Sequence, residues 1–514
     1  MLGWPLRLNN CIISQPSLKK EIALILLSTL LLPALALPAV YIIGKSSPKR
    51  AALLIVSIAL ADIVLVFMTL PTVLNSTAGS RYVESYYWLP TLNSSLTLFV
   101  DGISFSMAIM TLVLILVAAL YSIGYMSEKK GQAEYYTLLT LLFIGLVGVF
   151  IASNLMFFYF CWEIMLVPTY FIIGGWGSKD SYKTAFKFFI FTHAGAVFVL
   201  LGIGAIFMLT GSLDMFQAQT ALMNAQQGIV KWILLSFTVG FAVKMAVVPV
   251  HIWLPDTYSE APAPMSALLS GVITGAGAYA MLRISMGTVF PAISATIFGN
   301  QFLYGLAFFG ILSAFFGSLI ALVVNDIKKI IAYSSIAHMG YILFGLSLFP
   351  IPVAIIGTAL HLLTHGISKG LLFLSAGAII KSFKTRDIRE MGGLAMKNPI
   401  VATCSTIAGL SIAGIPLFAC FISEILIFVG AVQKINVNEN FILPVVLMLI
   451  ATVLSLGYIL RFIRQVLLGV APLEKTQIVP FYMKVSLIIL AVFVVILGVW
   501  PTFFINLITT VSLG

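Results

Sequence analysis

Long apolar segments alternate with short polar loops along the whole chain. Runs of about 20 apolar residues are long enough to cross the hydrocarbon core of a bilayer as a helix. Counting these runs predicts fourteen transmembrane helices and therefore an all-α polytopic membrane protein. The predicted helices lie near residues 21–44, 51–75, 101–124, 135–152, 155–176, 184–210, 230–250, 265–290, 301–324, 329–349, 353–380, 399–432, 441–467 and 480–513.

Positive charge is distributed unevenly between the loops. Nineteen lysine and arginine residues border the odd-numbered loops, whereas seven lie on the other side. Cytoplasmic loops carry the excess of basic residues, so the pattern places the odd loops in the cytoplasm and both termini on the outer side. An error of one helix in the count would remove this asymmetry. The charge pattern therefore supports the number of helices.

The N-terminal segment allows a second interpretation. Lys19 and Lys20 precede an apolar run that contains Ala34-Leu-Ala36, a combination typical of a signal peptide with a small-residue cleavage site. The run continues to Ile43, which makes it long enough to span a membrane. We therefore favour a retained first helix.

Composition narrows the class of protein further. Hydrophobic residues make up 61% of the chain and charged residues 9%, with a mean hydropathy of +1.11, whereas about 25% of residues are charged in soluble proteins. The chain has 28 basic and 17 acidic residues. In a membrane protein, this excess of basic residues indicates orientation in the bilayer and not binding of nucleic acid. The sequence contains no phosphate-binding loop, dinucleotide fingerprint, haem motif or nucleophile triad, which argues against catalysis on a bound organic substrate.

Two of the predicted helices are interrupted. The seventh breaks at Pro249, and the twelfth contains Gly414-Ile-Pro416. Broken helices in corresponding positions are typical of transporters built from inverted repeats. We therefore predict helices 1–3 in residues 1–134, two inverted five-helix repeats in residues 135–290 and 301–467, and a C-terminal helix 14 in residues 468–514.

Lys244 and Glu163 are ionisable residues inside the seventh and fifth apolar segments. A lysine at the centre of a spanning helix costs about 2.5–3.5 kcal/mol on insertion scales, so we expect the two side chains to form a pair. A buried pair with a purely structural role is the alternative. We favour a switchable proton site, because a carboxylate raises the proton affinity of a lysine when close and lowers it when distant.

A second group of ionisable residues lies in the tenth to twelfth segments. His361, His365 and Lys369 recur at spacings of four residues, so they share one helical face. This pattern, extended by His338, predicts a proton relay in preference to a set of hydrogen-bonded core residues. A zinc site is disfavoured because the His-x-x-x-His motif lacks the metalloprotease glutamate and an evident third ligand. Glu424 provides an acid in the broken twelfth helix.

Three further polar positions are less informative. His193 stands alone in an apolar segment, where structural and functional roles are equally compatible with the sequence. Asp62 in the second segment has no partner that the sequence identifies. Asp326-Ile-Lys-Lys329 lies at a cytoplasmic helix end, where we favour a solvated structural anchor.

Several motifs resemble those of the antiporter-like subunits of respiratory complex I and of Mrp-type cation/proton antiporters. The resemblance covers roughly residues 100–460. It rests on Lys244, His251-Ile-Trp-Leu-Pro-Asp256, Glu260-Ala-Pro-Ala-Pro264, Ser266-Ala-Leu-Leu-Ser-Gly271 and Lys329-Ile-Ile-Ala-Tyr-Ser-Ser-Ile-Ala-His-Met-Gly-Tyr341. It implies fourteen helices, inverted repeats of helices 4–8 and 9–13, and proton translocation along a polar axis at mid-membrane.

The resemblance also implies roles for the ionisable residues. The matching positions are Glu163 and Lys244 for the coupled pair, His338, His365 and Lys369 for the central relay, and Glu424 for the exit-side group. Most relatives carry lysine at this last position, and a glutamate there resembles the M-type branch of the family.

One position departs from the family pattern. Relatives usually carry a lysine two residues before a Gly-x-Tyr sequence in the eighth segment, whereas this chain has Gly275 there. The relay is then expected to pass through water or through Thr274.

These observations lead to a functional hypothesis. We interpret the chain as a proton-translocating subunit in the membrane arm of a complex I-like NADH-quinone oxidoreductase in the plasma membrane of a prokaryote. FMN, iron–sulfur clusters and quinone are expected on partner subunits, other antiporter-like subunits are expected among those partners, and no metal or cofactor is expected on this chain. The alternatives are a subunit of an Mrp-type Na⁺/H⁺ antiporter, of an energy-converting hydrogenase or of a related dehydrogenase, and a subunit that pumps nothing.

Overall fold

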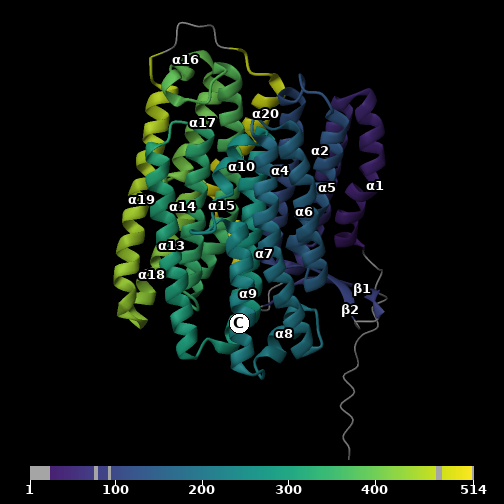
Figure 1. The fold of residues 1–514 in the computed structure, drawn as a ribbon, viewed down its shortest axis with the longest axis vertical. Coiled ribbons are helices and arrows are strands. Elements are labelled where there is room, and N and C mark those ends of the chain that lie inside the picture. The colour runs from purple at the N-terminus through teal and green to yellow at the C-terminus, as the bar shows by residue number, and fades with distance from the viewer. Residues whose placement is uncertain (1–23, 75–78, 91–93, 471–476, 512–514) are drawn as a thin grey trace, which may run out of the picture.

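The described part of the chain contains fourteen helices that are long and apolar enough to cross a membrane. This confirms the predicted all-α polytopic class. The computed structural model describes residues 24–74, 79–90, 94–470 and 477–511. Lys19 and Lys20, on which the signal-peptide interpretation depends, lie outside these residues. The helices run side by side along the long axis of the molecule (Figure 1).

The first eight helices and a hairpin make up the N-terminal part of the bundle. The order is α1 (Ile25–Ser46), α2 (Pro48–Met68), α3 (Leu70–Leu74), β1 (Tyr82–Leu89), β2 (Ser94–Val100), α4 (Gly102–Tyr125), α5 (Gln132–Ile151), α6 (Leu155–Trp176), α7 (Ser181–Thr210) and α8 (Met215–Leu222). The antiparallel hairpin β1–β2 was not predicted. It lies at the end of the bundle opposite α16 (Leu394–Lys397) (Figure 1).

The C-terminal part contains the longest helix of the described chain, α15, and ends in a break that was not predicted. Its elements include α13 (Ile297–Val323), α14 (Ile327–Ser347), α15 (Pro352–Phe383), η5 (Ile388–Glu390), η6 (Glu439–Phe441), α19 (Ile442–Phe462), η7 (Ile463–Leu467), α20 (Phe481–Val499) and α21 (Thr502–Thr509). The prediction of one helix over residues 480–513 is wrong, because α20 ends at Val499 ahead of Pro501, whose ring cannot continue a helix.

The seventh span is broken, but not where the sequence suggested. Helix α9 (Gln227–Met245) ends four residues before Pro249, and α10 (Leu254–Glu260) follows. Ala246 adopts a left-handed backbone with φ 56°, and its N–H closes the last turn of α9. The break at Pro249 is therefore corrected to Met245, and this places Lys244 in the last turn of a half-helix.

The twelfth span is broken where it was predicted to be. Helix α17 (Pro399–Ile412) stops shortly before Gly414, whose left-handed φ of 66° suits a residue without a side chain, and α18 (Ala419–Val437) continues the span. The division of the chain into two inverted repeats stays a prediction.

The eighth span is the most buried part of the molecule. It comprises α11 (Ala263–Leu268), η2 (Leu269–Ile273), α12 (Thr274–Ala280), η3 (Met281–Val289) and η4 (Phe290–Ile293), of which η2 and η3 are π-helical. A Cβ atom added to Gly271 would lie 2.8 Å from the carbonyl oxygen of Gly366 on α15. The eighth span and α15 therefore touch through their backbones, and π-helical segments of this kind are frequent at functional sites.

Candidate functional site

Lys244 is buried at the break of the seventh span. Its side chain is 2% exposed, and its ammonium nitrogen lies 4.8 Å from the ring centre of Trp162 on α6. The face of an aromatic ring attracts a cation, and the C-terminal turn of a helix is the end that favours positive charge. The broken helix and the indole ring therefore accommodate the charge that an intact apolar helix would not.

Glu163 does not form the predicted ion pair with Lys244. Its Oε2 lies 3.3 Å from Nδ1 of His193 on α7, and among the described residues no carboxylate lies within 4.0 Å of the Lys244 ammonium. The reason is geometric, because Trp162 occupies the position over the ammonium while the neighbouring Glu163 turns toward the flank of the bundle. The two charges still interact electrostatically at longer range.

His193 is the partner that sequence reasoning missed. Its side chain is 49% exposed and that of Glu163 is 27% exposed, so this pair lies on the lateral surface of the described chain. The ring also stacks on Phe189, one turn earlier in α7, with a centroid separation of 5.6 Å. No sequence spacing connects α6 with α7 here, so only the packing of the helices could identify the contact.

Lys369 lies deep in the second half of the bundle, on α15. It is fully buried, and its ammonium donates hydrogen bonds to the hydroxyl of Ser334 and, over 3.2 Å, to the carbonyl oxygen of Ile331 on α14. Within the described residues it has no carboxylate partner. Neutral oxygens alone therefore solvate this amine, which makes its environment different from that of an ion pair.

The three histidines come together beside Lys369, as the spacing predicted. His338 Nδ1 lies 3.2 Å from His361 Nε2, and His361 Nδ1 lies 2.9 Å from the hydroxyl of Ser423 on α18. The ring of His365 stands 5.3 Å from that of His338. Imidazole nitrogens can accept and donate a proton, so hydrogen bonds connect α14, α15 and α18 in sequence.

Glu424 completes this cluster from the broken twelfth span. It is 9% exposed, and its Oε1 has no hydrogen-bond partner among the described residues. Gly414 makes the position possible, because a Cβ atom there would lie 2.4 Å from Glu424 Oε2. The gap in the helix therefore leaves space for the carboxylate.

The cluster also corrects the argument that was made against a metal. Ligand atoms of His338, His361 and Glu424 lie within 4.8 Å of one another. The missing third ligand is thus Glu424, which is far away in the sequence. Nδ1 of His338 and Nε2 of His361 are hydrogen-bonded to each other, whereas Nε2 of His338 has no hydrogen-bond partner among the described residues.

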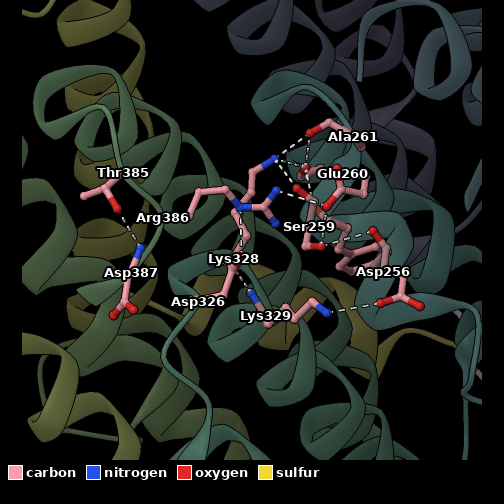
Figure 2. Close-up of polar contacts among 12 residues, drawn as sticks. Asp256, Ser259, Glu260, Ala261, Asp326, Lys328, Lys329, Thr385, Arg386 and Asp387 are labelled. Carbon is pink, nitrogen blue, oxygen red and sulfur yellow. Dashed lines mark hydrogen bonds and ion pairs between the residues drawn. The ribbon is translucent and has the colours of Figure 1, made fainter. Parts of the chain in front are cut away.

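Ion pairs at one end of the bundle join its two halves (Figure 2). Arg386 contacts Glu260, over 3.0 Å, and Asp326, over 2.8 Å. The ammonium of Lys328 is buried and donates to the carbonyl oxygens of Ser259 and Ala261. The expected anchor is therefore present, but at Lys328 it is buried and not solvated.

Asp256 holds the adjacent end of the broken seventh span. Its two carboxylate oxygens contact the ammonium groups of Lys187, over 3.1 Å, and Lys329, over 3.3 Å. Partial burial opposes ionisation, but the hydrogen bonds and charges of Lys187 and Lys329 outweigh it and lower the pKa of Asp256. Helix α10 is thereby tied to α7 and to α14.

Comparison with known proteins identifies relatives along most of the chain. The family described as NADH:quinone oxidoreductase/Mrp antiporter, transmembrane, matches residues 152–455, and the N-terminal family of complex I chain 5 matches residues 88–136. Subunit M of the NADH-quinone oxidoreductase of Rickettsia conorii is 31% identical over 476 residues, which cover 90% of this chain and 92% of that protein.

Further relatives differ in the enzyme to which they belong. Subunit M of the F(420)H(2) dehydrogenase of Methanosarcina mazei is 31% identical over 403 residues, 77% of this chain and 78% of that protein. A chain of respiratory complex I from Thermus thermophilus shares the fold, with a TM-score of 0.80 and 21% identity over 95% of this chain and 98% of that chain. The predicted resemblance is confirmed, and the chain belongs to the NADH:quinone oxidoreductase/Mrp antiporter family.

Proposed function

We propose that this chain is the M-type, proton-translocating subunit in the membrane arm of an NADH-quinone oxidoreductase. FMN, iron–sulfur clusters and quinone belong to partner subunits in this proposal, and other antiporter-like subunits adjoin the chain in the membrane. The complex resides in the plasma membrane of a prokaryote, with both termini of this chain on the outer side.

One observation supports the proposal above all others. Lys244, Lys369 and Glu424 are buried ionisable side chains within a largely apolar bundle. Each is costly within a bilayer, and ionisable residues in such positions mark ion pathways. A protein that only filled space in a complex would have no use for them.

The geometry of Glu163 suggests how the pathway is driven. Its carboxylate contacts His193 in this structure and interacts with Lys244 only at a distance. In the proposed cycle, quinone reduction elsewhere in the complex moves Glu163 between these two partners, and the change in charge near Lys244 releases its proton toward Lys369. The histidines then pass the proton to Glu424, from which it leaves on the outer side.

Affinity purification tests the assignment. The chain is tagged and extracted in a mild detergent that preserves the peripheral arm of a control complex, and the co-purifying proteins are identified by mass spectrometry. Flavin and iron–sulfur subunits are expected. Recovery of membrane subunits alone would contradict the proposal and favour an Mrp-type Na⁺/H⁺ antiporter.

A second candidate uses a different electron donor. The similarity to subunit M of an F(420)H(2) dehydrogenase is equal in identity to the similarity to the NADH-linked subunit of Rickettsia conorii. The same purification decides between them, because the electron-input subunit that co-purifies identifies the donor.

A further inference from the structure

A groove with a volume of about 600 Å³ opens on the lateral surface of the bundle, at the end opposite the β1–β2 hairpin. Helix α5 packs against both α1 and α6 and lies between them (Figure 1). It therefore forms the floor of what we call the α1–α6 groove. Gly175 on α6 lines this groove, and a Cβ atom added to it would meet no heavy atom within 4 Å. The missing side chain keeps the groove open.

The α1–α6 groove is polar at one end and apolar further in. Glu134 stands in the first turn of α5, and Leu138 lies one turn, about 6 Å, deeper along the same helix. On α6, Trp176 is the last helical residue, and Phe171 lies more than one turn deeper and is 51% exposed. A molecule that fills the groove along its length therefore needs a polar head and an apolar tail.

The polar end carries a carboxylate that the protein does not engage. Glu134 is exposed, and within the described residues its carboxylate makes no hydrogen bond and no ion pair shorter than 4.0 Å. The rings of Tyr170, Trp176 and Tyr182 line the same groove. Carboxylates and the faces of aromatic rings both attract cations. This end of the groove therefore favours an ammonium group and repels an anionic one.

A positive charge lies at the rim of the groove. The ammonium of Lys45, in the last turn of α1, is 4.4 Å from the ring centre of Tyr41, which lines the groove. Lys45 is exposed and interacts with Glu134 electrostatically without forming an ion pair. A phosphate can bind Lys45 while an ammonium of the same molecule binds Glu134. The two charges thus match a zwitterion better than they match an anion.

The aromatic residues alone would not identify a ligand. Tryptophan and tyrosine gather at both interfaces of membrane proteins in general, where their rings lie among lipid headgroups. Two features distinguish this group from such a belt, namely the open space beside Gly175 and the unengaged carboxylate of Glu134.

We propose that the α1–α6 groove binds one molecule of phosphatidylethanolamine. Its ammonium contacts Glu134, its phosphate contacts Lys45, and an acyl chain follows Leu138 and Phe171. A primary ammonium fits better than a choline headgroup, because its N–H groups can donate to the carboxylate and to tyrosine hydroxyls, whereas a quaternary ammonium has none to donate. The inference does not depend on proton translocation.

A photoactivatable lipid tests the groove. The tagged chain is purified with the subunits that accompany it and placed in nanodiscs of phosphatidylcholine that contain a small fraction of phosphatidylethanolamine with a photoreactive group in its acyl chain. After illumination, mass spectrometry is expected to find adducts on α6 near Phe171. The same photoreactive chain on phosphatidylcholine and on phosphatidylglycerol measures labelling by the surrounding bilayer.

Removal of the carboxylate tests the recognition of the headgroup. Glu134→Gln is expected to lower labelling by the phosphatidylethanolamine probe about two- to fivefold, the size typical of a partly exposed ion pair. Glu128→Gln is the matched control, because Glu128 lies in the preceding loop, is 83% exposed, and does not line the groove. Its labelling is expected to equal that of the wild type.

Filling the groove tests the position of the acyl chain. Gly175→Leu is expected to reduce labelling to the level of the phosphatidylglycerol probe, since the new side chain occupies the open space. Gly204→Leu on α7 is the control, because a Cβ atom there also meets nothing within 4 Å but lies outside the groove. Native gel electrophoresis checks that both variants assemble.

Three outcomes would overturn the inference. The first is equal labelling by all three lipids, which would mean that the groove is ordinary bilayer surface. The second is no labelling of the wild type above the phosphatidylglycerol level, as expected if a neighbouring subunit covers the groove. The third is unchanged labelling in both Glu134→Gln and Gly175→Leu. Because labelling is measured without NADH, none of these results bears on the proposed function.

Discussion

The site around Lys244 and the site around Lys369 use similar side chains in opposite surroundings. At the first, the acid and histidine are 27% and 49% exposed on the flank of the bundle. At the second, His338, His361 and Lys369 are completely buried, and Glu424 is nearly so. The acid and the histidine of the first site therefore face the surroundings of the chain, whereas the second site is enclosed by protein.

The proposed function gives the two sites different tasks. A partner or the lipid environment can change the position of Glu163 directly, because its carboxylate lies on the lateral surface. No such influence reaches Lys369, whose ligands are the oxygens of Ser334 and Ile331. In the proposed cycle, the first site responds to a partner, and the second relays the proton.

Loss of the buried amine is expected to have the largest effect. Lys369→Met keeps most of the apolar part of the side chain but removes the protonatable group from a fully buried position. Translocation is expected to fall by about 100-fold or more while the complex still assembles. Vesicle acidification and native gel electrophoresis measure the two properties, and persistent acidification would show that this amine is not needed for translocation.

Neutralising the exposed acid should have a smaller effect. Glu163→Gln retains the ability to contact His193 but removes the charge that acts on Lys244. We expect a translocation rate between those of Lys369→Met and the wild type, because Lys244 and the buried groups around Lys369 remain in place. An equal or greater loss than in Lys369→Met would remove the distinction between the two sites.

A substitution at Gly414, whose backbone is left-handed, tests the second site further. In Gly414→Ala the new Cβ would collide with Glu424 Oε2, and the left-handed φ of 66° would cost about 1 kcal/mol for a residue with a side chain. We expect slower proton release and a modest fall in thermal stability. Gly204→Ala is the control, since an added Cβ there meets nothing within 4 Å.

The smallest effect is expected at Asp256, which contacts Lys187 and Lys329 at one end of the bundle. Its pKa is lowered by Lys187 and Lys329, so the ion pairs stabilise the fold above the unfolded value of about 3.9 and cease to do so as the pH falls through the lower folded value. Because the side chain is 43% exposed, Asp256→Asn should cost about 0.2–1 kcal/mol at neutral pH. Thermal unfolding of the detergent-solubilised complex would show this difference at pH 7 and little difference in acid; an equal difference at both would contradict the assignment.

The sequence correctly predicted the features that depend on local pattern. Hydropathy and loop charge identified the number of helices, and the spacing of His361, His365 and Lys369 identified a shared face. It failed where packing between distant helices decides the outcome. Neither the contact of Glu163 with His193 nor the proximity of Glu424 to the histidines leaves a signal in sequence spacing.

The break of the seventh span shows a second kind of failure. Proline is a strong local signal, but α9 ends at Met245, directly before Ala246, whose left-handed backbone no residue preference would suggest. The buried serine hydroxyls were missed for a related reason. Serine is common in apolar helices, where it bonds its own backbone, and only the tertiary structure distinguishes Ser334 from such residues.

The contact between Gly271 and Gly366 has a mechanical consequence. Because two backbones touch there without side chains between them, the eighth span and α15 have no compressible layer and no room to slide. Movement that accompanies a transport cycle must then occur in the broken helices on either side of this contact. The contact between the eighth span and α15 stays fixed.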